Sequence, residues 1–379
     1  MRPRPFIGLS NSQLARRIVA PALFVGALFI AVFTHEPPPP PTLEDLALDE
    51  VTLSGAALGT TWSVRVVGPA PNETGQQELA AAITAALESV DEKMSTWRED
   101  SELTALNQHT SSDPFPVAPS TMAVLMRAET VWQQSDGAFD VTVYPLVRAW
   151  GFGGATLTEP PSETELASLL KRVGQSHLIL DQLHGQVTKT RPDVTVDLSA
   201  IAKGYAVDRI SVALADLGYT NHMAEVGGEI RASGWNRFKQ PWRLAIERPD
   251  TMARAVEVVV QLRNLAMATS GDYRNFREQD GRRWSHTIDP RTGEALLHTL
   301  ASATVLHPEC AFADAYATAF MVLGPDAAMT MAKRLDIAAL FLVRLDDGGF
   351  EHRSTPAFER HQANARAVPG PPDALPSSG

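Results

Sequence analysis

Cysteine is almost absent from this sequence. Cys310 is the single cysteine among 379 residues, so no disulfide can form within the chain and no cysteine-based metal site can be built. Its alanine-rich, apolar surroundings indicate a small buried side chain. Positive charge is also scarce, because 33 Lys and Arg stand against 44 Asp and Glu, for a formal net charge of −11. An acidic chain repels phosphate backbones, so we do not expect nucleic-acid binding.

The glycine fingerprint of dinucleotide-binding folds is missing as well. Gly227 and Gly228 form a pair inside a strand-like run, but the G-x-G-x-x-G spacing is absent, which excludes a Rossmann domain. Such a pair indicates a bulge or a close backbone approach. The composition, 44% hydrophobic and 20% charged, is that of an ordinary globular protein, long enough for one large domain or two modest ones.

The N-terminal segment carries an uncharged run preceded by arginines. Residues 18–33 contain no charge, and about 16 residues is near the short limit for a membrane span of roughly 17–25. No small-x-small cleavage site follows. We therefore expect a cytoplasmic basic segment at 1–17 and an uncleaved signal-anchor helix at 18–33, with the rest of the chain outside the cytoplasm. A cleaved signal peptide is the alternative.

The globular part is expected between a stiff linker and a polar tail. Pro37 to Pro41 form a polyproline spacer inside a linker at 34–50. Periodic apolar patterns run through residues 51–350, which we take as one domain. Residues 351–379 are rich in Pro, Ala and Ser and are expected to be disordered.

Helical and strand-like patterns mix along this domain. The apolar spacing predicts four helices, at Gln76–Ser95, Ser162–Val173, Ile201–Leu217 and Ala311–Leu323. Alternating or β-rich runs predict six strands, at Thr60–Val67, Val194–Val196, Leu244–Glu247, Val256–Leu262, Ala301–Leu306 and Ile337–Val343. The order is not a regular β-α alternation, which favours an α+β domain over a doubly wound sheet.

A predicted strand ends at Asp197, and a tight turn leads from it into a helix that carries Lys203 in its first turn. Backbone groups at such a junction are unpaired and available to a ligand or an ion. The alternative is that Asp197 merely caps the helix.

Asp314 and Thr318 lie four residues apart on a predicted helix, so both oxygens leave the same face. A carboxylate and a hydroxyl one turn apart suit a hard cation such as Mg²⁺. The alternative is a lone aspartate hydrogen-bonded to a neighbour.

Two turns complete the candidate site. In the Asp136–Asp140 turn, Phe139 offers a flat face, and the backbone of Ala138 and Asp140 could contact the edge of a heterocycle. A plain turn with one buried Phe is the alternative. His286 precedes a rigid Asp-Pro-Arg-Thr-Gly turn and could act as a base near neutral pH. A structural hydrogen bond is its alternative role.

Taken together, these segments resemble the ApbE family of flavin transferases, the FAD:protein FMN transferases. The matching pieces, in order, are Ala57–Trp62, Met94–Trp97, Asp100–Leu103 with Asn107, Asp136–Asp140, Trp150–Gly153, Val196–Gly204, Glu225–Gly228, His286–Gly293 and Asp314–Thr318. The resemblance spans residues 51–323 and implies a single mixed α/β domain of the tunnelling-fold-like kind. Leu58 departs from the family's usual Met, a similar apolar side chain.

The resemblance also implies a role for each site residue. The metal ligands would be the backbone carbonyl of Ala200 and the side chains of Asp314 and Thr318. The FAD contacts would be Leu58, Trp97, Ala138, Phe139, Asp140, Asp197, Lys203 and Ile288. His286 would be the catalytic base, with Asp197 as the other candidate.

The implied reaction is Mg²⁺-dependent transfer of FMN from FAD to a Ser or Thr hydroxyl of an acceptor protein, with release of AMP. The acceptor would be a membrane electron-transport subunit with a Ser/Thr-Gly-Ala-Thr-like segment. The anchor would hold the catalytic domain in the periplasm at a bacterial inner membrane. Three alternatives remain open: an FAD pyrophosphatase that gives FMN and AMP, a non-enzymatic flavin carrier, and an oxidoreductase with bound FAD.

Overall fold

The computed structural model describes residues 48–152, 160–249, 255–272, 276–279, 282–285, 287–296 and 298–366. All of them belong to the compact unit that begins at Leu48. The predicted anchor at 18–33 and the polyproline stretch lie outside the described residues, so both stay predictions. Within the described ranges, no helix combines the length and the apolar character that a membrane span requires.

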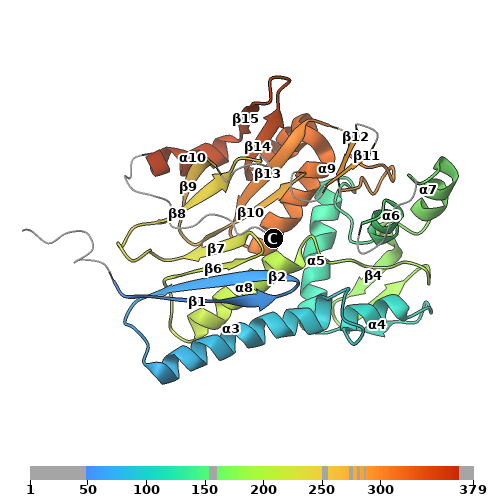
Figure 1. Ribbon diagram of the computed structural model, residues 1–379. Helices are drawn as coiled ribbons and strands as arrows, with labels where there is room; N and C mark the ends of the chain where they lie inside the picture. The colour runs from blue at the N-terminus through green and yellow to red at the C-terminus, as the bar shows by residue number, and fades with distance from the viewer. Residues whose placement is uncertain are drawn as a thin grey trace, which may run out of the picture. The chain divides into compact units, whose positions relative to one another are not determined.

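An eight-stranded antiparallel sheet is the centre of the described fold (Figure 1). Its spatial order is β1-β2-β6-β7-β10-β13-β14-β15, and each neighbouring pair is antiparallel. The strands are β1 Glu50–Ala57, β2 Thr60–Val67, β6 His222–Val226, β7 Glu229–Ser233, β10 Leu265–Gly271, β13 Leu300–His307, β14 Ala338–Arg344 and β15 Phe350–Ser354.

The sheet is buried on both faces, and strand β14 shows how. Ala339, Phe341 and Val343 point into the helical core, whereas Ala338, Leu340 and Leu342 belong to a second apolar cluster. Successive side chains of a strand point to opposite faces, so one continuous apolar run serves two layers.

One face is covered by helices and the other by a hairpin with a helix. The helical layer consists of α3 Glu73–Met94, α5 Pro119–Gln134, α8 Ala202–Asp216 and α9 Cys310–Arg334. The opposite cluster contains the hairpin of β8 Trp242–Glu247 and β9 Val256–Leu262, together with α10 Pro356–Arg366. In Figure 1, α3 and α8 lie at the lower end of the sheet near β1 and β2, and α10 lies beside β8 and β9 at the upper left.

Smaller elements surround this core. They are α4 Glu102–Gln108, α6 Tyr144–Ala149, α7 Glu163–Leu170, the short helix Gln175–His177, the three-stranded sheet of β3 Phe115–Pro116, β5 Gln186–Lys189 and β4 Leu178–Asp181, and the hairpin of β11 Phe276–Gln279 and β12 Arg282–Ser285.

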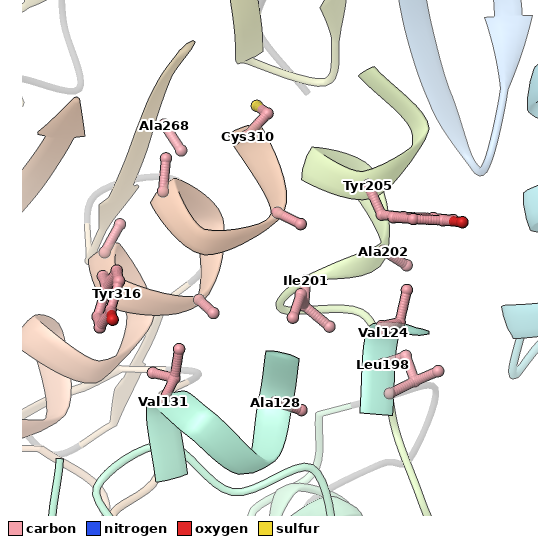
Figure 2. Close-up of a cluster of buried hydrophobic side chains, with 14 of the residues drawn as sticks. Val124, Ala128, Val131, Leu198, Ile201, Ala202, Tyr205, Ala268, Cys310 and Tyr316 are labelled. Atoms are coloured by element: carbon pink, nitrogen blue, oxygen red, sulfur yellow. The ribbon is translucent and has the colours of Figure 1, made fainter. Parts of the chain in front are cut away.

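Helices α5, α8 and α9 meet in the buried cluster of Figure 2. Their contact faces are rich in small residues, such as Ala128, Ala202 and Ala311, which lets the helices approach closely. Helix α9 is continuous to Leu323 and is then interrupted at Gly324, where φ is 73° and ψ is 172°. The predicted end of this helix at Leu323 is therefore confirmed.

Most predicted elements are confirmed within a few residues. Strands β2 and β9 have the predicted bounds, and α8 is flanked by the predicted end residues Ile201 and Leu217. Helix α3 begins earlier, at Glu73, because the Asn72 side chain accepts a hydrogen bond from the Gly75 N–H at 2.9 Å and caps it. The predicted helix from Ser162 ends at Leu170 instead of Val173.

Two predictions are wrong. Residues Val194–Val196 form no strand, because side chains take their backbone hydrogen bonds. The Asn107 amide pairs with the N–H and the carbonyl oxygen of Val196, at 2.7 and 2.8 Å. The Lys189 ammonium donates to the Val194 carbonyl oxygen at 3.2 Å. The predicted disordered tail at 351–379 is ordered as far as Arg366, because it supplies edge strand β15 and then α10, whose Phe358 is fully buried.

Candidate functional site

A cavity of about 460 Å³ lies where the helical layer meets the ends of several strands. Ten of the twelve residues assigned above to flavin, metal or base contribute to its lining: Leu58, Ala138, Phe139, Asp140, Asp197, Ala200, Lys203, Ile288, Asp314 and Thr318. Of the predicted site residues that the structure describes, only Trp97 lies elsewhere.

The tight turn of the β1–β2 hairpin forms one wall of the cavity. Leu58 and Gly59 both have positive φ, 53° and 71°, as a two-residue hairpin turn with the right twist requires. A bulky residue in the left-handed region costs of order 1–2 kcal/mol, and such strain concentrates at functional sites. The turn therefore holds the Leu58 side chain in a fixed place at the cavity.

The Asp136–Asp140 segment forms a turn, as predicted, but the side chains of Phe139 and Asp140 are buried inside the protein. Phe139 is only 2% exposed and belongs to the core. The Asp140 carboxylate is buried and accepts hydrogen bonds from the Thr142 N–H at 2.7 Å and from the Gln175 N–H at 2.8 Å. Burial raises the pKa of Asp140, and these bonds oppose the rise. With Phe139 and Asp140 buried, a ligand contact from this segment would have to come from its backbone, and the predicted contacts of Ala138 and Asp140 stay predictions.

The turn before α8 is held in place by hydrogen bonds to residues outside the turn. Asn107 and Lys189 bind its incoming strand-like segment, and the Asp197 N–H donates to the Val141 carbonyl oxygen at 2.7 Å. The Asp197 carboxylate accepts hydrogen bonds from the N–H and the hydroxyl of Ser199. Asp197 thus stabilises the turn that places Ala200 on the cavity wall, and it does not cap α8.

The Asp314 carboxylate is buried at the floor of the cavity. Its Oδ2 accepts a hydrogen bond from the Gly204 N–H at 3.1 Å. Burial raises the pKa of Asp314, whereas Lys203 and this hydrogen bond lower it. One turn further along α9, the Thr318 hydroxyl lies 3.2 Å from the Ser270 hydroxyl of β10. Both predicted side-chain ligands therefore face the cavity from the same side of α9.

Glu229 is a site residue that the sequence did not single out. Its Oε1 lies 2.6 Å from the Lys203 ammonium, while its Oε2 is buried with no hydrogen-bond partner among the described residues. Burial raises the pKa of Glu229 to about 7 against the opposing effect of Lys203. Burial alone would lower the pKa of Lys203, but Asp314 and Glu229 raise it overall. The pair of glycines before Glu229 was the available signal, since it indicated a close backbone approach.

The donors around the cavity fit a hard divalent cation. In the described part of the chain, no group of three or more His, Cys, Asp or Glu side chains is arranged as a metal site. A metal here would therefore need the Ala200 carbonyl and the Thr318 hydroxyl in addition to Asp314. Such an all-oxygen set, with Glu229 Oε2 unsatisfied nearby, suits Mg²⁺ and not Zn²⁺.

Trp97 lines a second cavity of about 550 Å³ that adjoins the first. Leu58, Gly59, Ser199 and Lys203 line both. The Trp97 side chain is 77% exposed, an unusual state for a large aromatic residue. An extended ligand could therefore reach from the first cavity past Lys203 to the exposed indole.

The turn that follows the predicted base closes the cavity on another side. His286 itself lies outside the described residues, so its role stays a prediction. Ile288 lines the cavity and pairs with Ala295 across the turn. The Trp150 indole N–H donates to the Gly293 carbonyl oxygen at 2.8 Å and anchors the turn.

This arrangement defines a class of protein: an α+β domain with a partly apolar cavity, in which a lysine and several oxygen donors converge at one end. The sequence model of the ApbE family matches residues 58–341. The chain belongs to the ApbE family.

Relatives and solved structures agree with this assignment. The chain is 42% identical to an FAD:protein FMN transferase of Vibrio cholerae over 308 residues, 81% of this chain and 91% of that protein. It is 34% identical to an FAD:protein FMN transferase of Escherichia coli K12, over 89% of this chain and 95% of that protein. The structure of the flavin transferase ApbE from Vibrio cholerae superposes with a TM-score of 0.76 at 39% identity, over 83% of this chain and 99% of that one. The apo form of the Pseudomonas stutzeri flavinyl transferase ApbE gives 0.75 at 34% identity, over 83% and 98%.

Proposed function

We propose that this chain transfers FMN from FAD to a Ser or Thr hydroxyl of an acceptor protein, in a Mg²⁺-dependent reaction that releases AMP. The observation that carries the proposal is that one cavity brings together Lys203, Asp314, Thr318 and the Ala200 turn. The transferase activity of relatives at 34–42% identity over most of the chain supports the same reaction.

The charges of the cavity support the need for a metal ion. Lys203 is paired with Glu229 at 2.6 Å, and Asp314 adds a second carboxylate. These three side chains together have no net positive charge, so they cannot by themselves offset a diphosphate. A bound Mg²⁺, held by Asp314, Thr318 and the Ala200 carbonyl, would supply that missing positive charge.

Each residue has a distinct part in the proposed chemistry. Lys203 binds a diphosphate oxygen from the first turn of α8, while Leu58 and Ile288 hold the rings between apolar walls. The acceptor hydroxyl oxygen attacks the FMN phosphorus, the bond to the bridging oxygen breaks, and AMP leaves with that oxygen. The hydroxyl proton passes to a base. His286 is the proposed base, and Asp197 is the alternative.

The acceptor experiment tests the hydroxyl directly. The enzyme, FAD and Mg²⁺ are incubated with a fragment that contains a Ser/Thr-Gly-Ala-Thr-like segment, and with the same fragment whose Ser or Thr is replaced by alanine. Intact mass should show one added FMN on the first fragment and none on the second. FMN and AMP formed equally with both fragments would indicate a pyrophosphatase, and bound FAD without AMP would indicate a carrier.

We also propose that residues 18–33 anchor the enzyme in a bacterial inner membrane, with the catalytic domain in the periplasm and a membrane electron-transport subunit as acceptor. The arginines before the uncharged run support this orientation. A reporter enzyme that is active only in the periplasm should be active when it is fused after Pro41. Activity of a cytoplasm-dependent reporter at the same position would contradict the orientation.

A further inference from the structure

The N-termini of helices α8 and α9 are not capped by the side chains of their own N-cap residues. The residue before α8, Ile201, has no capping side chain, and the side chain of Glu309 makes no capping hydrogen bond to α9. The first N–H groups of a helix have no partner inside the helix. Here an aspartate of the opposite helix accepts them in both cases.

The two contacts are reciprocal. Asp208 of α8 accepts hydrogen bonds from the first two N–H groups of α9, with Cys310 N to Oδ1 and Ala311 N to Oδ2 both at 3.0 Å. Asp314 of α9 accepts the Gly204 N–H in the first turn of α8, at 3.1 Å. Asp208 follows Gly204 by one helical turn, and Asp314 follows Cys310 by one turn.

The pairing fixes how the two helices lie against each other. Figure 2 shows the start of α8 at Ala202 and the start of α9 at Cys310 in neighbouring helices. Gly204 permits the close approach, because a Cβ there would lie 2.4 Å from the Cys310 carbonyl oxygen. The contacts at both ends of this short stretch are hydrogen bonds to carboxylates, which are stronger than neutral ones.

Asp208 is itself held in place from a third element. The Arg231 guanidinium of β7 lies 2.5 Å from Asp208 Oδ1, so the carboxylate is fixed by a charge as well as by two N–H groups. Asp208 does not line either of the cavities around Lys203. It therefore makes no direct contact with a ligand in either cavity.

We propose that Asp208 is a positioning residue for the metal site: by capping α9 from α8, it sets Asp314 and Thr318 opposite Ala200. The consequence for the metal rests on the proposed function, whereas the positioning itself does not. Loss of the cap frees the first turn of α9, and the Asp314 carboxylate then moves away from Gly204 and from the Ala200 turn.

Asp208→Asn is the test variant, because it keeps the size of the side chain and loses one acceptor and the charge. Asp208→Ala removes both acceptors and serves as the stronger variant if it folds. Asp216→Asn is the matched control, since Asp216 is an exposed aspartate at the end of the same helix. Thermal melting confirms that each variant is folded at the assay temperature.

Amide exchange of the full chain measures the positioning without any metal. Peptides that cover residues 198–206 should exchange at least threefold faster in Asp208→Asn than in the wild type and in Asp216→Asn, because the Gly204 N–H loses its partner. Equal exchange in all three proteins would overturn the inference.

Mn²⁺ titration followed by electron paramagnetic resonance measures the consequence for the metal. The dissociation constant should rise at least tenfold in Asp208→Asn and stay at the wild-type value in Asp216→Asn. A purely structural role would lower the melting temperature and leave Mn²⁺ affinity unchanged, which would also overturn the inference. Mn²⁺ binding that survives Asp314→Ala would instead contradict the proposed metal site, and the exchange measurement would then still decide the role of Asp208.

Discussion

Replacing Gly204 by alanine sets two opposite effects against each other. An alanine inside a helix is more stable than a glycine by about 1 kcal/mol, so helix propensity alone predicts a more stable protein. A Cβ at this position would instead lie 2.4 Å from the carbonyl oxygen of Cys310 and 2.9 Å from the Cα of Ala311. Both are backbone atoms, which cannot move aside unless α9 moves with them.

The geometry indicates which effect is larger. Ordinary contact begins at 3.4 Å, so α8 and α9 must separate by about 1 Å at this level, and overpacking of this kind costs about 1–3 kcal/mol. The separation also lengthens the 3.1 Å hydrogen bond from Gly204 to Asp314, whose loss costs about 1 kcal/mol. After the gain in propensity, we expect Gly204→Ala to lower the free energy of unfolding by about 1–3 kcal/mol.

Urea unfolding at neutral pH measures this difference. Ala215→Gly, on the exposed side of the same helix, is the control for propensity and should lose up to about 1 kcal/mol. A Gly204→Ala protein as stable as the wild type, or more stable, would show that the two helices do not approach as closely as described.

Three further predictions concern the site and the core. Asp314→Ala should keep its fold, because alanine is a good helix former, and should lose more than ~10²-fold in Mg²⁺-dependent AMP release; near-normal release would remove Asp314 from the site. His286→Asn should bind FAD normally and transfer FMN ~10²–10⁴-fold more slowly, and it should lose the rise in rate near pH 6.5 that a histidine base gives; an unchanged pH–rate profile would exclude His286 as the base. His222 is buried, with Nε2 2.7 Å from the Ser211 hydroxyl, and burial lowers its pKa to about 4. The unfolded chain binds a proton near pH 6.5 and the folded chain does not, so stability should be full above pH 6.5 and fall by roughly 3 kcal/mol down to about pH 4. His222→Gln should lose this contribution to the fall in stability, whereas a variant at the exposed His184 should keep it; urea midpoints between pH 8 and pH 4 measure both.

Apolar periodicity correctly predicted the helices and strands whose buried face is visible in their own pattern of apolar residues. Strand β9 alternates along its length, and α8 carries a complete helical stripe from Ala202 to Leu214. The prediction failed where partners distant in sequence decide the local structure. Val194–Val196 looks like a strand, yet Asn107 and Lys189 take its backbone hydrogen bonds, and no local pattern reveals them.

The candidate site was predictable to the extent that its side chains lie in short motifs. Asp314 and Thr318 reach the cavity because helical spacing puts them on one face, and the Ala200 turn follows from its place before α8. Glu229 was missed because the glycine pair before it indicates a close backbone approach but does not identify a partner, which the distance from Lys203 does. The caps that join α8 to α9 were missed for the same reason, since Asp208 and Cys310 are about a hundred residues apart.

The yield of AMP for each FMN attached to the acceptor tests the central claim most directly. Enzyme, FAD, Mg²⁺ and an acceptor fragment are mixed; AMP is measured by chromatography and the adduct by intact mass, at several times. Transfer predicts equal amounts of AMP and FMN adduct at every time, and neither product with Asp314→Ala or in EDTA. AMP that accumulates with free FMN and no adduct would contradict the claim that this cavity transfers FMN to protein.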